Sequence, residues 1–191
     1  MDETPYTTDE MLAKALRSDT RVLGEIIERY ETKLSRYIQR KSNASSEDRK
    51  DILQNIFIKI YKNINDFDPD LSFSSWAYRI ARNEMVDWYR REKRRPHLSL
   101  EGDEGVMQTL ASELGADIAA QKAELRQAIE EAVQTLPEKY QDIVELRFFE
   151  EKSYDEIADI LALPPGTVAV RINRVKKMLQ EALKKHYGQQ H

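Results

Sequence analysis

Cysteine is absent from this chain of 191 residues, and histidine occurs only three times. The first absence excludes disulfides, thiol catalysis and cysteine-ligated zinc, and it is typical of a protein in a reducing cytosol. His97, His186 and His191 are isolated from one another, and no glycine-rich loop of the kind that cradles phosphates is present. These observations predict a protein that is not an enzyme and that has no catalytic residues, no metal and no cofactor.

Glycine and proline are scarce, at six residues each, which favours helices over a turn-rich β protein. No run of apolar residues approaches the roughly 18 that a membrane span requires. The first residues, MDETPYTTDEMLAKAL, are acidic and have no apolar core, so they do not resemble a secretory signal. We therefore expect a cytoplasmic protein without membrane insertion.

The formal charge of the whole chain is -4, but the charges are unevenly distributed. Residues 1–95 hold 19 basic and 17 acidic side chains (+2), and residues 125–191 hold 10 and 11 (-1). The stretch 96–124, with one basic and six acidic side chains (-5), carries the acidity. Two local clusters are basic, RREKRR at 90–95 and the segment 167–187. Because DNA responds to charges within about 10 Å at moderate salt, these clusters matter more than the net charge.

Apolar residues at helical spacing organise most of the chain. Helices are predicted over 22–38, 46–64, 74–94, 120–136 and 137–148. Ser45 or Ser46 is the predicted N-cap of the second of these helices. The acidic stretch holds three glycines and no firm periodicity, as a linker does. The prediction is an all-α fold of two small helical domains, 1–95 and 125–191, joined by the linker 96–124, with a helix-turn-helix in the C-terminal domain.

The helix-turn-helix prediction rests on SYDEIADILALPPGTVAVRINRVKKML, which runs from Ser153 to Leu179. Ser153 and Glu156 fit a capping box, Gly166 can supply a positive φ to the turn, and Thr167 is the predicted N-cap of the second helix. One face of that helix is apolar: Val168, Ile172, Val175, Leu179 and Ala182. Its other side is rich in Arg and Lys and can enter a major groove. The alternative is an ordinary helical hairpin with a solvated basic face.

A second unusual stretch, FSSWAYRIARNEMVDWYRREKRR at 73–95, interleaves aromatic and basic side chains on one predicted helix. Aromatic rings that stack on unpaired bases, with cations along the backbone, are typical of surfaces that hold single strands. The alternative places Trp76, Ile80 and Met85 in the core and the arginines on the surface. We favour the core for Trp76 and nucleic acid for the basic end from Arg90. A chain with both features can grip a promoter as duplex and hold an opened segment.

In order and spacing, these stretches resemble an extracytoplasmic-function sigma factor, the small two-domain kind of bacterial RNA polymerase specificity subunit. DILQNIFIKIYKNINDF (51–67) is similar to the family helix that docks on the polymerase β′ clamp. The aromatic and basic stretch is similar to the helix that recognises and melts the -10 element. The segment 136–183 is similar to the family's -35-reading domain. The resemblance covers about residues 10–95 and 125–187.

The resemblance implies roles for matching positions. Those expected to contact core polymerase are Asp51, Gln54, Asn55 and Lys59. Those expected at the -10 element belong to a base-capturing loop and the helix after it: Phe67, Asp70, Ser72, Arg79, Arg82, Asn83, Asp87, Arg90 and Arg91. Those expected at the -35 element are Thr167, Ala169, Val170, Arg171, Asn173, Arg174 and Lys177. Flipping a base costs a few kcal/mol, so the capturing loop must return stacking and hydrogen bonds.

Three positions depart from the family pattern. Asn55 stands where Glu is usual, and Ala169 and Val170 stand where Lys or Arg and Ser are common. The two apolar side chains either touch thymine methyl groups or leave this helix a weaker DNA reader than its relatives.

The expected function is that of an initiation factor that directs core polymerase to -35 and -10 elements and stabilises strand opening. The implied partners are the β and β′ subunits of RNA polymerase, promoter DNA in duplex and single-stranded form, and an anti-sigma factor. Two alternatives stay open: a stand-alone helix-turn-helix regulator, and a sigma factor recruited by another DNA-bound partner. The acidic linker is either a solvated tether or a mimic of nucleic acid in a basic polymerase channel.

Overall fold

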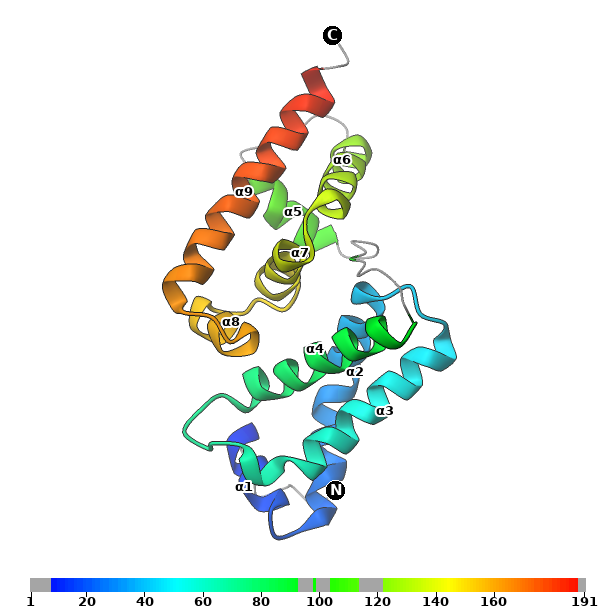
Figure 1. Cartoon of the computed structure of the whole chain (residues 1–191), viewed down its shortest axis with the longest axis vertical. Coiled ribbons are helices and arrows are strands. Elements are labelled where there is room, and N and C mark those ends of the chain that lie inside the picture. The colour runs from blue at the N-terminus through cyan, green and yellow to red at the C-terminus, as the bar shows by residue number, and fades with distance from the viewer. Residues whose placement is uncertain (1–7, 93–97, 99–103, 114–121, 189–191) are drawn as a thin grey trace. The chain divides into compact units, whose positions relative to one another are not determined.

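The computed structural model describes residues 8–92, 98, 104–113 and 122–188, and all helices in these ranges are shown in Figure 1. No strand occurs among the described residues, so the prediction of an all-α fold is confirmed. The chain forms two compact units, and the boundary between them along the sequence follows Pro96. The end of the RREKRR cluster and most of the predicted linker lie outside the described residues. No described helix is long and apolar enough to cross a membrane.

The first unit is a bundle of amphipathic helices. Its α-helices are α1 (Asp9–Leu16), α2 (Leu23–Lys41), α3 (Ser46–Lys62) and α4 (Phe73–Glu92). Short 3-10 turns at Thr20–Val22 and Ile64–Asp66 precede α2 and follow α3. α3 packs against both α2 and α4. The apolar faces of these helices supply the largest fully buried side chains, including Tyr30, Tyr37, Tyr78, Phe73 and Ile56.

Ser45 is the residue that caps α3. Its hydroxyl accepts the backbone N–H of Asp48, and the Asp48 side chain accepts the backbone N–H of Ser45 in return. This reciprocal capping box satisfies two donors that the first turn of a helix would otherwise leave without partners. The choice that the sequence left between Ser45 and Ser46 is therefore resolved.

The short helix α1 holds both ends of the loop that connects α3 to α4. The Glu10 carboxylate accepts the backbone N–H of Phe73 at 3.1 Å, which satisfies a donor in the first turn of α4. Arg17 donates to the carbonyl oxygen of Ile64 at 3.4 Å and to that of Phe67. α1 is itself fixed to α2, because Tyr30 donates to Asp9 at 2.5 Å. Contacts more than 45 residues apart in sequence thus set the course of this loop.

The second unit consists of α5 (Glu104–Glu113), α6 (Lys122–Thr135), α7 (Glu138–Val144), α8 (Tyr154–Leu161) and α9 (Pro165–Gly188). α9 packs against α6 and α7. α7 continues into a π-helical turn at Glu145–Phe149, which the apolar spacing did not predict. Ser153 and Glu156 form the predicted capping box at α8. Val168, Ile172, Val175 and Leu179 are buried as predicted, whereas Ala182 is half-buried and Leu183 is buried instead.

The turn of the helix-turn-helix differs from the prediction in two ways. The second helix begins at Pro165, so Thr167 lies within its first turn and is not its N-cap. Pro at the start of a helix is favourable, because its fixed φ suits the helix and its missing N–H needs no partner there. The positive φ belongs to Ala162 (51°) and not to Gly166. The N–H of Leu163 bonds to the carbonyl oxygen of Ala158 at 2.9 Å, which is the Schellman pattern that requires such a left-handed residue.

Part of the acidic stretch folds with the second unit. α5 packs against the π-helical turn, and Leu110 and Ala111 are buried there. Leu98 is also fully buried, and its carbonyl oxygen accepts a hydrogen bond from the side chain of Gln134. The described portion of this stretch therefore contributes apolar side chains to a core, in addition to its negative charge.

Candidate polymerase and nucleic-acid interfaces

The outer face of α3 carries three of the side chains expected at the core polymerase. Asp51, Gln54 and Asn55 are all exposed. Ile58 and Tyr61 continue this face by further turns, and each is 41% exposed. Positions spaced by three and four lie on one side of a helix, so the carboxylate and amide groups adjoin an exposed apolar pair. An apolar centre beside polar groups is typical of a protein-protein interface.

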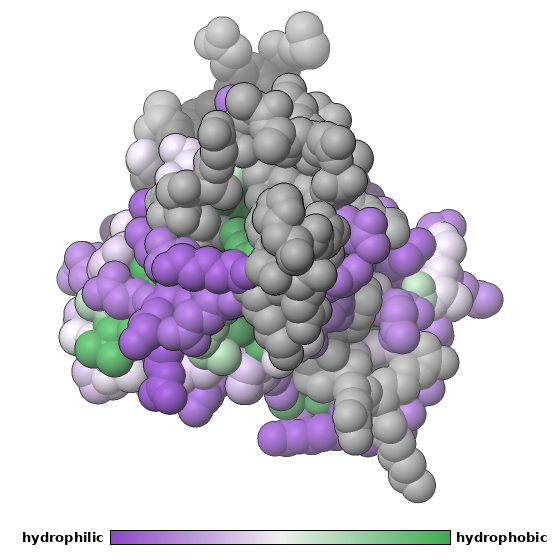
Figure 2. Space-filling model, turned by 90° about the horizontal axis from the view of Figure 1, so that it is seen from above, coloured by the Kyte–Doolittle hydropathy of each residue, from purple (hydrophilic) through white to green (hydrophobic). Residues whose placement is uncertain are grey.

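Sequence reasoning missed Ile58 and Tyr61 because both fit the general apolar pattern of α3. Only the packing shows which apolar residues of this helix stay outside the core. The residues of α3 that lie in the core are Ile52, Ile56, Phe57 and Ile60. On the face of the molecule in Figure 2, hydrophilic side chains predominate among the described residues.

Lys59, the fourth residue expected at the core polymerase, is directed toward α4. Its ammonium nitrogen lies 2.5 Å from a carboxylate oxygen of Glu84 and 3.3 Å from one of Asp87. Burial lowers the pKa of Lys59, but the hydrogen bonds and charges of Glu84 and Asp87 raise it by more, so the net pKa lies above the ordinary value. Lys59 therefore stays charged through neutral pH and is held between two carboxylates.

Glu84 is a buried carboxylate on α4, only 1% exposed, that the sequence did not single out. In addition to Lys59, it accepts a hydrogen bond from Arg91 at 3.1 Å. Asp87 lies 3.9 Å from Arg90 as well as contacting Lys59. We call these five residues, Lys59, Glu84, Asp87, Arg90 and Arg91, the Glu84 cluster. Sequence spacing could have suggested Glu84 with Arg91, which are two turns apart, but not the contact with Lys59 on another helix.

The aromatic side chains of α4 belong to the core, which favours the core alternative over stacking on bases. Phe73, Trp76, Tyr78, Trp88 and Tyr89 are between 0% and 7% exposed. The preference for the core at Trp76 is therefore right, and it extends to the other four. The physical reason is that α4 packs against α1, α2 and α3, so its large rings fill the interior and its polar and charged side chains extend toward solvent.

Phe67 stands at the start of the predicted base-capturing loop and is 2% exposed. Its ring centroid lies 5.4 Å from those of Phe73 and Trp76. Such an aromatic cluster is rigid, because each ring is packed edge-on or tilted against its neighbours. The structure thus places Phe67 in the core beneath the loop.

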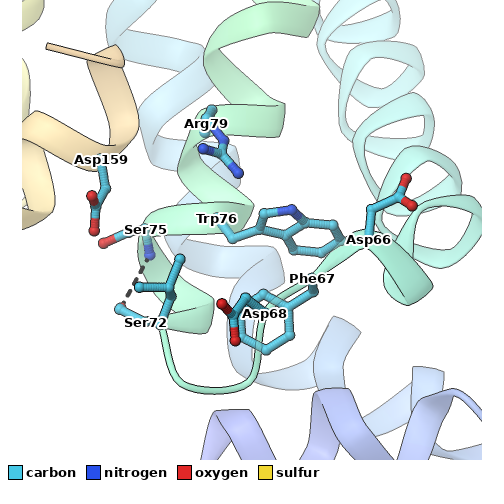
Figure 3. A pocket seen from close by; sticks show the side chains of 9 residues that line it. Asp66, Phe67, Asp68, Ser72, Ser75, Trp76, Arg79 and Asp159 are labelled. Atoms are coloured by element: carbon cyan, nitrogen blue, oxygen red, sulfur yellow. Dashed lines mark hydrogen bonds between the residues drawn. The ribbon is translucent and has the colours of Figure 1, made fainter.

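A pocket lies over this aromatic cluster, as Figure 3 shows. The residues of the first unit that line it are Asp66, Phe67, Asp68, Leu71, Ser72, Ser75, Trp76 and Arg79. Ser75 donates its backbone N–H to the Ser72 hydroxyl at 3.2 Å, and Asp70 donates its N–H to the Asp68 carboxylate at 3.0 Å. The loop is therefore shaped by its own short side chains. The pocket combines apolar walls with hydroxyl, carboxylate and guanidinium groups.

The remaining residues expected at the -10 element follow this pocket along α4. Arg79, Arg82, Asn83, Asp87 and Arg90 are spaced by three and four, so they share one side of the helix. Asn83, Arg90 and Arg91 are exposed, whereas Arg79, Arg82 and Asp87 are half-buried. A polar strip that begins at a pocket and ends in cations has the chemistry needed to bind a nucleotide base and the phosphates that follow it.

On α9, the residues expected at the -35 element divide by exposure. Asn173, Arg174 and Lys177 are exposed, and Val170 is the most exposed large apolar side chain described, at 65%. The other three, Thr167, Ala169 and Arg171, are half-buried at the flanks. The Arg174 guanidinium lies 6.0 Å from the centre of the Tyr140 ring, and Lys177 lies 3.9 Å from Glu181.

No group of three or more His, Asp or Glu side chains in the described ranges is arranged to hold a metal ion.

Two family models match the chain in order. Residues 26–95 match "Sigma-70 region 2" and residues 126–179 match "Sigma-70, region 4". The ECF RNA polymerase sigma factor SigW of Bacillus subtilis is 34% identical over 175 residues, which cover 88% of this chain and 92% of that protein. The chain belongs to the extracytoplasmic-function sigma factors. The prediction of this family from sequence is confirmed, and its members are initiation factors and not enzymes.

The matches to other relatives also cover most of this sigma factor. The ECF RNA polymerase sigma-E factor of Escherichia coli is 29% identical over 181 residues, covering 90% of this chain and 92% of that one. The solved structure of CnrH in complex with the cytosolic domain of CnrY matches with a TM-score of 0.65 and 25% identity, over 93% and 97% of the two chains. The sigma factor RpoE of Bartonella quintana, solved with the anti-sigma factor NepR, has the same fold at a TM-score of 0.57 and 19% identity, over 84% and 96% of the two chains.

Proposed function

We propose that this sigma factor binds core RNA polymerase in the cytoplasm, directs it to promoters through -35 and -10 elements, and stabilises strand opening. The observation that carries the proposal is the match to both sigma-70 regions, together with a pocket and polar strip in the first and a helix-turn-helix in the second. The chain itself performs no chemistry in this scheme, because nucleotide addition belongs to the polymerase.

The core polymerase, through its β and β′ subunits, is proposed to bind the outer face of α3. Asp51, Gln54 and Asn55 supply polar contacts, and the exposed Ile58 and Tyr61 supply the apolar centre. Burying two such side chains on association would contribute most of the hydrophobic free energy of this contact. The Asn55 amide keeps a hydrogen-bonding group where the family usually has a charge.

The -10 element is proposed to place one flipped base in the pocket beside Phe67. Asp70 and Ser72 shape the loop, Arg79, Arg82 and Asn83 follow it, and Arg90 and Arg91 neutralise phosphates. Unstacking a base costs a few kcal/mol, and a rigid pocket returns this in contacts without ordering itself at the same time.

The -35 element is proposed to face the exposed side of α9. Asn173 and Arg174 have side chains suited to base edges, and Lys177 suits a phosphate. Thr167, Ala169 and Arg171 flank this face. Val170 is proposed to contact a thymine methyl group, because its exposed apolar side chain can pack against a methyl group but cannot form a hydrogen bond to a base edge.

An anti-sigma factor is proposed as a further partner. CnrH was solved with the cytosolic domain of CnrY, and the Bartonella RpoE with the anti-sigma factor NepR. Both proteins share the fold of this chain over more than four fifths of its length.

A run-off transcription assay tests the proposed function. The purified chain is added to sigma-free core polymerase with a pool of promoter fragments from its host. Transcripts that require both the chain and core polymerase are expected from a defined subset of fragments. No transcript and no core complex, combined with a shift of duplex DNA by the chain alone, would instead support a stand-alone regulator. Transcripts that need a -10 but no common -35 sequence would support recruitment by another DNA-bound partner.

A matched pair of variants tests the core interface in the same assay. The double substitution Asp51→Ala and Gln54→Ala should abolish the core complex and the transcripts. Glu31→Ala with Ser35→Ala, which changes an exposed carboxylate and an exposed hydroxyl on α2, should leave both intact. If both double variants lose the core complex and the transcripts to the same extent, α3 is not the docking face.

A further inference from the structure

The Glu84 cluster is unusual in placing an almost inaccessible carboxylate among residues expected to bind other molecules. Glu84 is 1% exposed and lies on α4, between the helix's buried rings and its polar side. A buried charge is strongly destabilising unless it is paired and hydrogen-bonded. Glu84 is paired twice, by Lys59 from α3 and by Arg91 from the end of α4.

The two oxygens of Glu84 have separate partners. One oxygen faces Lys59 at 2.5 Å, and the other accepts from a single terminal nitrogen of Arg91 at 3.1 Å. Lys59 also bonds to Asp87, so the ammonium group is fixed from two directions. Lys59 thereby orients the carboxylate, and the carboxylate in turn fixes the guanidinium.

Arg91 keeps most of its capacity for other contacts in this arrangement. A guanidinium has five N–H donors in a fixed plane, and the contact with Glu84 engages one terminal nitrogen. The side chain is 55% exposed, so the remaining donors are accessible to a phosphate. Restricting the rotamers of a long side chain before binding removes part of the entropy cost of immobilising it.

We propose that Glu84 is a positioning residue that holds Arg91 in place for the phosphate backbone of the -10 strand, with Lys59 fixing Glu84. This proposal rests on the proposed role of α4 at the -10 element. Glu84 does not touch DNA; it acts through Arg91.

The experiment measures binding of holoenzyme, made from the full chain and core polymerase, to a fluorescent fork-junction DNA whose -10 non-template strand is single-stranded. The promoter sequence comes from the run-off assay. Glu84→Gln should weaken binding about five- to tenfold, the scale of one charge-assisted hydrogen bond on a partly exposed side chain. Charge alone predicts the opposite sign, because removing an anion near DNA tightens binding.

Glu92→Gln is the matched control. Glu92 is exposed at the end of the same helix, so this change removes the same charge without touching the cluster. It should leave binding unchanged or up to about twofold tighter. If Glu84→Gln tightens binding as the control does, the positioning role is wrong.

A second comparison separates positioning from folding. In an Arg91→Ala background, Glu84→Gln should cause no further loss, because the guanidinium that it positions is gone. A similar loss in both backgrounds would mean that Glu84 acts through the stability of the bundle, and it would overturn the proposal. If wild-type holoenzyme forms but does not bind the fork junction, the proposed role of α4 at the -10 element is itself wrong. Wild-type binding with an unchanged Glu84→Gln variant rejects only the inference.

Discussion

The helices α4 and α9 both carry the cations that we propose to contact nucleic acid, but they hold those cations differently. In α4, Arg91 is tied to the buried Glu84, and Arg90 lies near Asp87. In α9, Arg174 lies near the ring of Tyr140, and Lys177 lies 3.9 Å from Glu181; the side chains of Lys177 and Glu181 are 77% and 66% exposed. A single strand is flexible, so a protein that captures it gains from cations set in advance; a duplex is already stiff, and mobile cations can adjust to it.

The prediction with the largest expected effect tests whether the two units unfold independently. Phe73 is fully buried against Tyr30, Phe67 and Trp76, so Phe73→Ala should cost the first unit about 3–5 kcal/mol of unfolding free energy. Both tryptophans of the chain, Trp76 and Trp88, lie in this unit. The denaturation midpoint followed by tryptophan fluorescence, which reports on the first unit, should therefore fall. The helical transition of the second unit, followed by circular dichroism, should keep its midpoint.

Phe148→Ala in the second unit is the control for that experiment, since Phe148 is 5% exposed. It should shift the circular dichroism transition and leave the fluorescence transition in place. If the fluorescence and circular dichroism transitions shift together in both variants, the two units unfold as one. α4 and α9 could then not be compared as surfaces of independent units.

A smaller effect is expected from the exposed cations of α9. Arg174→Ala should cost about 1–3 kcal/mol in binding of holoenzyme to a -35 duplex and relax the preference at one base pair. Lys177→Met should weaken binding to all duplexes alike and reduce the slope of log affinity against log salt by about one. Titrations at several salt concentrations with single-base variants of the duplex separate these outcomes. If Arg174→Ala also weakens all sequences alike, Arg174 is a phosphate contact and α9 reads fewer bases.

The capping box of α8 predicts a pH dependence for the second unit. Burial raises the pKa of Glu156, but hydrogen bonds from Ser153 and the charge of Lys152 lower it by more, so the net pKa lies below the ordinary 4.5. Its contribution to stability is complete above about pH 4.5 and is lost as the pH falls through the folded-state pKa. Ser153→Ala should cost about 1 kcal/mol near neutral pH.

Denaturation of the second unit between pH 3 and 7 measures this effect, with Glu156→Gln as the comparison. Glu156→Gln should remove the acid dependence that Glu156 contributes while keeping a side chain able to cap. An unchanged slope in that variant would show that other carboxylates control the acid stability of this unit.

The smallest effect should come from the turn between α8 and α9. Ala162 adopts a φ of 51°, which is unfavourable for a residue with a side chain. Ala162→Gly should stabilise the second unit by about 0.5–1 kcal/mol, because glycine removes this strain at the end of α8. A higher denaturation midpoint with unchanged -35 binding is expected. A lower midpoint would mean that the added freedom of the unfolded chain outweighs the relieved strain.

Sequence reasoning predicted most of the helices, their apolar faces and the family, because these depend on local spacing and on motif order. It did not predict α1, and it placed α5 in the linker. It misassigned the left-handed residue of the turn, since a glycine is the usual choice and Ala162 gives no sign of its conformation. It favoured the core for Trp76 but left the other rings of α4 open between the core and unpaired bases, because the burial of these rings depends on how many helices surround α4. Glu84 was overlooked because its partner Lys59 lies 25 positions away, on a helix whose rotation only packing determines.

The hydrogen bonds from α1 affect how this sigma factor can be divided into fragments. The match to the region 2 family model begins at residue 26, which leaves α1 outside it. A fragment cut at that boundary would lack the Glu10 contact with Phe73 and the Arg17 contact with Phe67. It would also expose the core surface that the fully or almost fully buried Leu12 and Leu16 cover. The smallest portion that keeps the pocket loop in its native shape must therefore begin no later than Thr8, the N-cap of α1.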